Sequence, residues 1–221
     1  RHYGDYSTGC AQVILPYVIG SNGVYEQQTA WEVLAEKCEL LVMWGADPTV
    51  TNDIDWVTTI HENAEGMEMV KKAGVPEIAI NPLKPDAAEY FGKNCEWIAP
   101  KPGTDMAMMI AMAHELESSG KVDREFIRKY TVGYDKFIAY VLGKTDGVAK
   151  TPAWAEKICG VKADAIKRLA HLMREKRSML MGGWGIQRAQ HGEQVHWMMV
   201  VLAAMCGHIG QPGGGFGFSY H

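Results

Sequence analysis

The chain has 221 residues, of which 47% are apolar and 22% charged, a composition typical of a globular protein and not of a disordered or fibrous one. Its formal charge is −4, from 22 Lys and Arg against 26 Asp and Glu, and its basic residues are scattered, which argues against a nucleic-acid or anionic-membrane partner. The longest uninterrupted apolar run, residues 197–206, is shorter than the about 20 residues that a membrane span needs, so we expect no transmembrane segment.

The first half of the chain alternates helical and strand patterns. Residues 29–37 have apolar side chains at helical spacing, with Thr29 as the expected N-cap. Residues 40–44 form a continuous apolar run typical of a strand buried on both faces. A helix is expected over 65–73, ending at Gly74, and short strands over 76–80 and 97–99. Strands that alternate with helices predict a parallel sheet with right-handed crossovers.

The rest of the chain is mainly helical in pattern. A long helix is expected over 105–119, capped by Thr104 and buried through a stripe of Met and small apolar residues. Residues 123–176 read as helices broken near Gly133, at 143–150 and at Gly160, a fourth strand follows at 178–181, and a core helix spans 193–208. The fold class is therefore α/β: a Rossmann-like parallel sheet flanked by helices, with a helical insertion over about 121–176.

Both ends of the chain lie inside continuing sequence patterns. It begins at Arg1 without a methionine and stops inside the glycine-rich run 212–221, so we expect a fragment of a larger protein. The five cysteines are dispersed without a C-x-x-C pair, which disfavours a disulfide framework and a zinc or iron–sulfur site and favours buried thiols.

Small and polar residues follow each predicted strand. Ligands of open parallel sheets bind at the carboxyl ends of the strands, where this chain has the segments 45–51, 81–82, 103–105 and 182–188. The G-x-G-x-x-G fingerprint of a dinucleotide-binding dehydrogenase is absent after the first strand, which weakens an NAD-dependent enzyme. Thr51 and Thr104 still offer hydroxyl groups to another phosphate-bearing ligand.

Three further positions have both a structural and a functional interpretation. Asp105 is either a first-turn carboxylate that complements the helix dipole or an acceptor for the N1–H and N2–H groups of a guanine. Arg188, in a segment that also holds Trp184 and His191, either clamps an anionic or oxo group or makes local structural contacts. The loop 4–9 would by itself be a helix start capped at Ser7 or Thr8.

Taken together, several motifs resemble one family over all 221 residues. They are Gly4-Asp-Tyr-Ser-Thr-Gly9, Val24-Tyr-Glu-Gln-Gln-Thr29, Gly182-Gly-Trp-Gly-Ile-Gln-Arg188, His191-Gly-Glu-Gln194 and Gly207-His-Ile-Gly-Gln-Pro-Gly-Gly-Gly-Phe-Gly217. The chain resembles the molybdopterin oxidoreductases of the dimethyl sulfoxide reductase family, within them the trimethylamine N-oxide, dimethyl sulfoxide and biotin sulfoxide reductases.

The resemblance implies a multidomain enzyme with a bis(molybdopterin guanine dinucleotide) molybdenum cofactor. Residues 1–20 would carry the metal-ligating loop, and 21–221 would form the domain that binds the dinucleotide. Ser7 matches the serine whose oxygen binds molybdenum, and a hard oxygen ligand suits this oxophilic metal.

Further cofactor contacts follow from the same resemblance. Asp105 matches the residue that recognises guanine, and Asn81 stands where many relatives have Asp. Trp184 and Arg188 match a turn beside the pterin and the substrate, so both are predicted catalytic residues together with Ser7. The full predicted cofactor-binding set is Val50, Thr51, Ile80, Asn81, Gly103, Thr104, Asp105, Trp184, Gly185 and Arg188.

The implied reaction is oxygen-atom transfer from an N-oxide or S-oxide to Mo(IV), with trimethylamine N-oxide as the first-choice substrate. A c-type cytochrome or a quinol-linked donor would supply the electrons, and the enzyme would be periplasmic, although the family also has cytoplasmic members. The hypothesis from another class is a nucleotide-binding structural module that has no activity without the rest of its parent protein.

Overall fold

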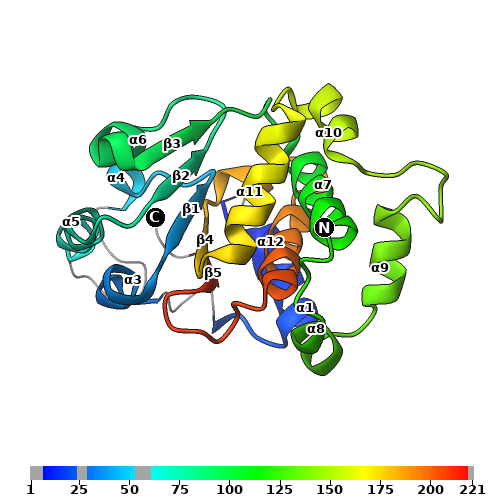
Figure 1. Ribbon diagram of the computed structural model, residues 1–221. Helices are drawn as coiled ribbons and strands as arrows, with labels where there is room; N and C mark the ends of the chain where they lie inside the picture. The colour runs from blue at the N-terminus through cyan, green and yellow to red at the C-terminus, as the bar shows by residue number, and fades with distance from the viewer. Residues whose placement is uncertain (1–6, 24–28, 53–60, 219–221) are drawn as a thin grey trace.

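The computed structural model describes residues 7–23, 29–52 and 61–218, and its centre is a five-stranded parallel sheet. The strands are β1 (Leu40–Trp44), β2 (Glu77–Ile80), β3 (Cys95–Ile98), β4 (Ser178–Gly182) and β5 (Gly215–Gly217), arranged in the order β3-β2-β1-β4-β5. All four pairings are parallel, which confirms the predicted α/β class. Figure 1 shows helices on both faces of this sheet.

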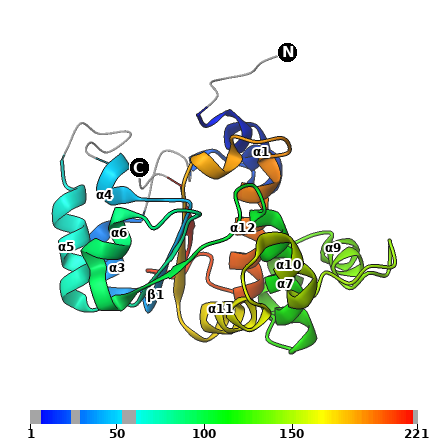
Figure 2. The same ribbon diagram turned by 90° about the horizontal axis from the view of Figure 1, so that it is seen from above.

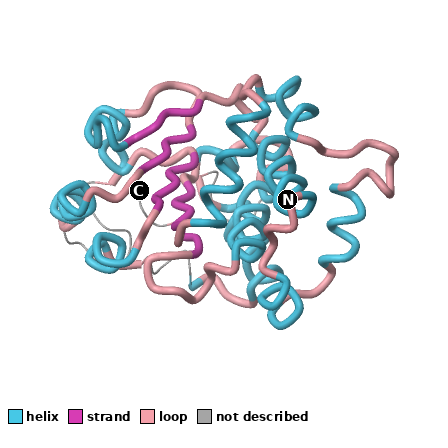
Figure 3. The backbone as a smooth tube through the Cα atoms, viewed as in Figure 1, coloured by secondary structure: helices cyan, strands magenta, loops and turns pink. Residues whose placement is uncertain are grey.

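One face of the sheet is covered by three helices, α3 (Trp31–Lys37), α5 (Asn63–Ala73) and α6 (Asp86–Phe91). They form the group to the left of the strands in Figure 3. Helices α3 and α5 approach closely because Gly66 has no side chain: a Cβ there would lie 2.1 Å from the indole of Trp31. Any larger residue at this position would force the two helices apart.

The other face carries the larger part of the core. Here α7 (Asp105–Ser118), α11 (Ala163–Glu175) and α12 (Glu193–Cys206) pack on the even-numbered residues of β1 and β2, and α1 (Gly9–Ile19) packs on α12. The predicted stripe of α7 is confirmed, since its members are fully buried: Met108, Met109, Met112, Ala113 and Leu116. Helix α11 buries Ile166, Leu169, Ala170 and Met173 at helical spacing.

The predicted helical segment 123–176 consists of α8 (Arg124–Tyr130), α9 (Tyr134–Val141), α10 (Pro152–Cys159) and α11. Its breaks lie at Gly133, 143–150 and Gly160, as the sequence indicated. Helices α10 and α11 both contact α7, and α11 also covers the sheet. The division of the chain at residue 20 and the treatment of 121–176 as an insertion stay predictions.

The structure also differs from the sequence-based expectations at several elements. Helix α3 begins at Trp31 with Ala30, not Thr29, at its N-cap position. The strands expected at 40–44 and 76–80 are confirmed, the second of them beginning at Glu77. The third strand lies at 95–98 instead of 97–99. The start of α1 agrees with the sequence, since Thr8 stands at its N-cap position, but the sequence patterns missed α6, which is short, and β5, which consists mostly of glycine.

No helix among the described residues is long and apolar enough to cross a membrane. All five cysteines are free thiols; Cys38, Cys159 and Cys206 are buried, and Cys10 and Cys95 are partly buried.

Candidate functional site

The carboxyl ends of the strands meet at one edge of the sheet, where hydrogen bonds continue past the last strand residues. Gly45 donates its N–H to the carbonyl of Ile80 at 2.8 Å, Asn81 donates to Ile98 at 3.1 Å, and Gly183 donates to Trp44 at 2.9 Å. The loops that follow β1, β2 and β4 are thereby held side by side. Figure 2 shows α1, α4 (Pro48–Thr51) and the turn after β4 on the same side of the sheet.

The strand order reverses between β1 and β4 at this edge. From β1 the chain proceeds to β2 and β3 on one side, whereas β4 and β5 lie on the other. Open parallel sheets bind ligands outside such a reversal point. The backbones of the loops after β1 and β4 are in direct contact, since a Cβ on Gly183 would lie 1.8 Å from the carbonyl oxygen of Gly45. The side chain of Ile186 packs over Gly45. Glycine is required at both positions.

Asp105 lies at the start of α7, buried at 8% exposure beside the end of β1. The indole Nε1 of Trp44 donates a hydrogen bond to its Oδ1 at 2.8 Å. Oδ2 has no hydrogen-bond partner among the described residues, and each carboxylate oxygen has two lone pairs, so the group keeps acceptor capacity. The carboxylate is therefore held at the candidate site by a tertiary contact and not only by its own helix.

Thr104 occupies the N-cap position of α7, but its side chain does not cap the helix. Its hydroxyl donates instead to the carbonyl of Lys101 at 2.6 Å, which closes the turn 101–104. The expected capping bond is therefore wrong. Gly103 has φ +72° with nothing within 4 Å of an added Cβ, so the turn is open where a ligand would approach.

The loop after β1 is organised by Asp47. Its carboxylate accepts the backbone N–H groups of Asp86 at 2.8 Å and Ala87 at 3.2 Å, the first two residues of α6. Its carbonyl oxygen accepts the hydroxyl of Thr51 at 2.8 Å. Val50 is 59% exposed and Thr51 is also exposed, so both predicted binding residues face outward from this loop.

The predicted residues after β2 have different surroundings. The side chain of Ile80 is 1% exposed and belongs to the core, so only its backbone reaches the edge. Asn81 is partly buried, and its carbonyl oxygen accepts the indole N–H of Trp97 at 2.8 Å.

Ser7 is the first described residue, exposed in the turn before α1 and in contact with the turn that follows β4. The contact is made by Gln187, whose Nε2 donates to the carbonyl of Ser7 at 2.6 Å. Residues 4–6 of the motif lie outside the described residues. The structure therefore brings Ser7 and the 182–188 segment together, although they are remote in sequence.

The turn after β4 includes the short 3-10 helix η2 (Gly185–Gln187) and divides its side chains between core and surface. Trp184 is 5% exposed, and its ring stacks on His196 at 5.4 Å between centroids. Burial lowers the pKa of His196 to about 3, so this histidine is neutral beneath the turn. Gly185 and Arg188 are exposed, and Arg188 makes no ion pair with any described residue. An ion pair with Glu193 on the following helix, one of the local contacts that a structural role would use, is therefore not formed.

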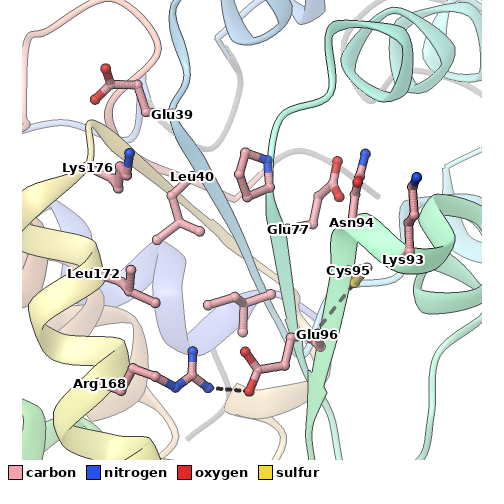
Figure 4. A pocket seen from close by; sticks show the side chains of 12 residues that line it. Glu39, Leu40, Glu77, Lys93, Asn94, Cys95, Glu96, Arg168, Leu172 and Lys176 are labelled. Carbon is pink, nitrogen blue, oxygen red and sulfur yellow. Dashed lines mark hydrogen bonds and ion pairs between the residues drawn. The ribbon is translucent and has the colours of Figure 1, made fainter.

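A separate cavity of about 240 Å³ lies at the opposite, amino edge of the sheet. Figure 4 shows Glu77 beside Asn94 and Cys95 on one side of it, and the ion pair of Arg168 with Glu96 on the other. None of the predicted site residues lines this cavity.

Three contributors to the edge were not found from the sequence: Trp44, Asp47 and Gln187. Each acts on a residue 39 to 180 positions away, so no local pattern identifies its partner. The sequence indicates their role only indirectly, through their position: Trp44 ends a predicted strand, and Asp47 and Gln187 lie just beyond strand ends.

Comparison with known proteins gives a consistent result. The sequence profile of a family described as molybdopterin oxidoreductase matches residues 1–221. A dimethyl sulfoxide/trimethylamine N-oxide reductase of Rhodobacter capsulatus is 52% identical over 218 residues, 99% of this chain and 26% of that protein. A trimethylamine-N-oxide reductase of Haemophilus influenzae is 51% identical over 220 residues, 100% of this chain and 26% of its own length. The chain thus spans about a quarter of the length of these relatives.

Among solved structures, acetylene hydratase from Pelobacter acetylenicus superposes with a TM-score of 0.64 at 16% sequence identity. The match covers 94% of this chain and 28% of that one, and at this identity it shows the fold alone.

Proposed function

The chain belongs to the molybdopterin oxidoreductase family, and we propose that it is the part of an N-oxide or S-oxide reductase that binds the guanine dinucleotide of the molybdenum cofactor. Family membership implies a molybdenum–molybdopterin cofactor. Relatives that are named trimethylamine N-oxide reductases support trimethylamine N-oxide as the first-choice substrate. The bis(molybdopterin guanine dinucleotide) form, a c-type cytochrome or quinol-linked donor and a periplasmic location belong to the same proposal.

The residues at the carboxyl edge fit such a cofactor. An added Cβ at Gly103 or Gly185 would meet nothing within 4 Å, so both turns leave room for a ligand at the backbone. Thr51 is exposed in the segment that follows β1, and Asn81 is partly exposed just after β2. We propose that Val50, Thr51, Ile80 and Asn81 contact the nucleotide, Ile80 through its backbone.

The observation that carries the proposal is the buried carboxylate of Asp105. Asp164, another acidic first-turn residue, lies at the surface of α11 with 97% side-chain exposure. Asp105 is buried and bonded to Trp44 at a strand end. Two parallel acceptors held in this way are complementary to the N1–H and N2–H donors of guanine.

Two side chains at the edge would act on the metal and the substrate. When bound, the cofactor supplies the two-electron oxygen-transfer chemistry, and the chain supplies ligand, orientation and electrostatics. Ser7 offers a hard oxygen ligand. Arg188 offers a permanent cation with forked donors, which would hydrogen-bond the polar oxygen of the oxide as negative charge develops on it. Trp184 supports the turn from the core, and its predicted catalytic contact stays a prediction.

The test is an Asp105→Asn variant of the parent protein, produced under limiting cofactor. Replacing one acceptor by an N–H₂ group opposes a guanine donor, and the loss of a bond to a charged group should weaken binding about 10- to 150-fold. Molybdenum and acid-released guanosine monophosphate per protein are the measurements. Asp164→Asn, also in the first turn of a helix, is the matched control and should keep full occupancy.

Unchanged guanine content in the Asp105 variant would return Asp105 to a structural role at the start of α7. Full occupancy with molybdenum but no oxide reduction by the parent protein would leave the alternative, a nucleotide-binding module.

A further inference from the structure

The side chain of Gln187 connects two segments that are 176 and 180 residues apart in sequence. Its Oε1 accepts the backbone N–H of Ala11 at 2.7 Å, and its Nε2 donates to the carbonyl oxygen of Ser7 at 2.6 Å. Gln187 is 1% exposed. Because one end of the amide must accept and the other must donate, its orientation is fixed, and only glutamine supplies both groups at this length.

On the N-terminal side, Gln187 satisfies the start of α1. Ala11 is the third residue of that helix, and its N–H has no carbonyl partner within the helix. Thr8 stands at the N-cap position without making a side-chain capping bond. The cap therefore comes from the turn after β4, and the same amide also holds the residue just before the cap, Ser7.

On the β4 side, Gln187 belongs to a closely packed turn. A Cβ on Gly192 would lie 1.8 Å from the carbonyl oxygen of Gln187, and one on Gly45 would lie 2.3 Å from Ile186. The next residue, Arg188, is exposed. The side chains of these two consecutive residues thus have opposite environments. That of Gln187 is buried against Ser7, and that of Arg188 is exposed at the carboxyl edge of the sheet.

We propose that Gln187 is a positioning residue that fixes the Ser7 loop to the turn carrying Arg188, and thereby sets the metal ligand relative to the substrate-binding cation. The inference rests on the proposed function for the roles of Ser7 as metal ligand and of Arg188 as the cation that binds the substrate. It goes beyond that function by assigning the placement of the ligand loop to one buried amide.

Gln187→Met tests the two bonds, because it has similar length and volume but removes both the acceptor for Ala11 and the donor to Ser7. Gln211→Met, which removes an amide bonded to the carbonyl of Gly207 at 2.9 Å, is the matched control.

The experiment uses the full-length parent protein and two readouts. In cofactor-free protein, amide hydrogen exchange at Ala11 reports the cap. In molybdenum-loaded protein, X-ray absorption at the molybdenum edge reports the oxygen ligand from the protein, with Ser7→Ala as the reference for its loss. We expect Gln187→Met to exchange at Ala11 at least tenfold faster and to show an altered oxygen shell. We expect Gln211→Met to match wild type in both measurements.

Faster exchange in Gln187→Met with an unaltered metal spectrum would show that Gln187 only caps α1, and would overturn the inference. If Ser7→Ala itself leaves the spectrum unchanged, the assignment of Ser7 as ligand fails and the inference fails with it. Amide exchange at Ala11 would distinguish that outcome from a failure of the cap, because the exchange is measured in protein without the metal and would still be faster in Gln187→Met.

Discussion

Glu77 is a buried carboxyl group at the amino edge of the sheet, and its ionisation should destabilise the fold. The residue is 1% exposed at the start of β2, and neither carboxyl oxygen has a hydrogen-bond partner among the described residues. Burial raises the pKa of Glu77 to about 8 from an ordinary 4.5, with Lys71 opposing the shift as the nearby cation. The folded protein therefore keeps this group neutral at pH 7 while the unfolded chain ionises it.

The direction of the pH dependence follows from proton binding. Between pH 4.5 and about 8 the folded state holds one more proton at Glu77 than the unfolded state, so stability falls as the pH rises through this window. The slope is about 1.4 kcal/mol per pH unit, which gives a loss of about 2–3 kcal/mol between pH 6 and pH 8. Glu77→Gln keeps the shape of the side chain and removes the titration.

Urea denaturation of wild type and Glu77→Gln across this range measures the effect. We expect the free energy of unfolding of the variant to exceed that of wild type increasingly from pH 6 to pH 8. Glu125→Gln, at an exposed position of α8, should track wild type at every pH. A difference between wild type and Glu77→Gln that stays constant with pH would show that Glu77 is not neutral in the fold.

Five further substitutions, at four positions, test the carboxyl edge. In the parent protein, Ser7→Ala should remove most oxide reductase activity and leave the circular dichroism spectrum unchanged; normal turnover in fully metallated variant would contradict the ligand role. Arg188→Lys and Arg188→Gln should both lower turnover, Gln by about tenfold more, whereas an effect on melting temperature alone would make Arg188 structural. Trp44→Phe removes the donor to Asp105 and should lower guanine dinucleotide occupancy under limiting cofactor about tenfold, with equal occupancy as the contrary result. Asp47→Ala removes the cap of α6 and should cost about 1–2 kcal/mol in urea unfolding, and a smaller change would mean that water replaces the carboxylate.

The sequence alone determined the elements whose apolar pattern is strong. β1 is apolar at every position and buried at every position, so its run of five residues was sufficient to define it. The buried stripe of α7 and the helix breaks at Gly133 and Gly160 could also be predicted, because the spacing of apolar residues and the presence of glycine determine structure locally. The family motifs likewise identified Ser7, Asp105 and Arg188 as candidates without any tertiary information.

Tertiary structure alone decided how these candidates are held. β5 exists only because β4 offers a free edge to a glycine-rich segment that has no strand pattern of its own. The hydroxyl of Thr104 donates to the carbonyl of Lys101 and accepts no N–H of α7, because its orientation is set by the fold of the turn and not by the residue type. The bonds from Trp44 to Asp105 and from Gln187 to Ser7 span 61 and 180 residues. Such contacts depend on strand order and loop packing, which are set by burial of the whole core and leave no periodic trace in the chain.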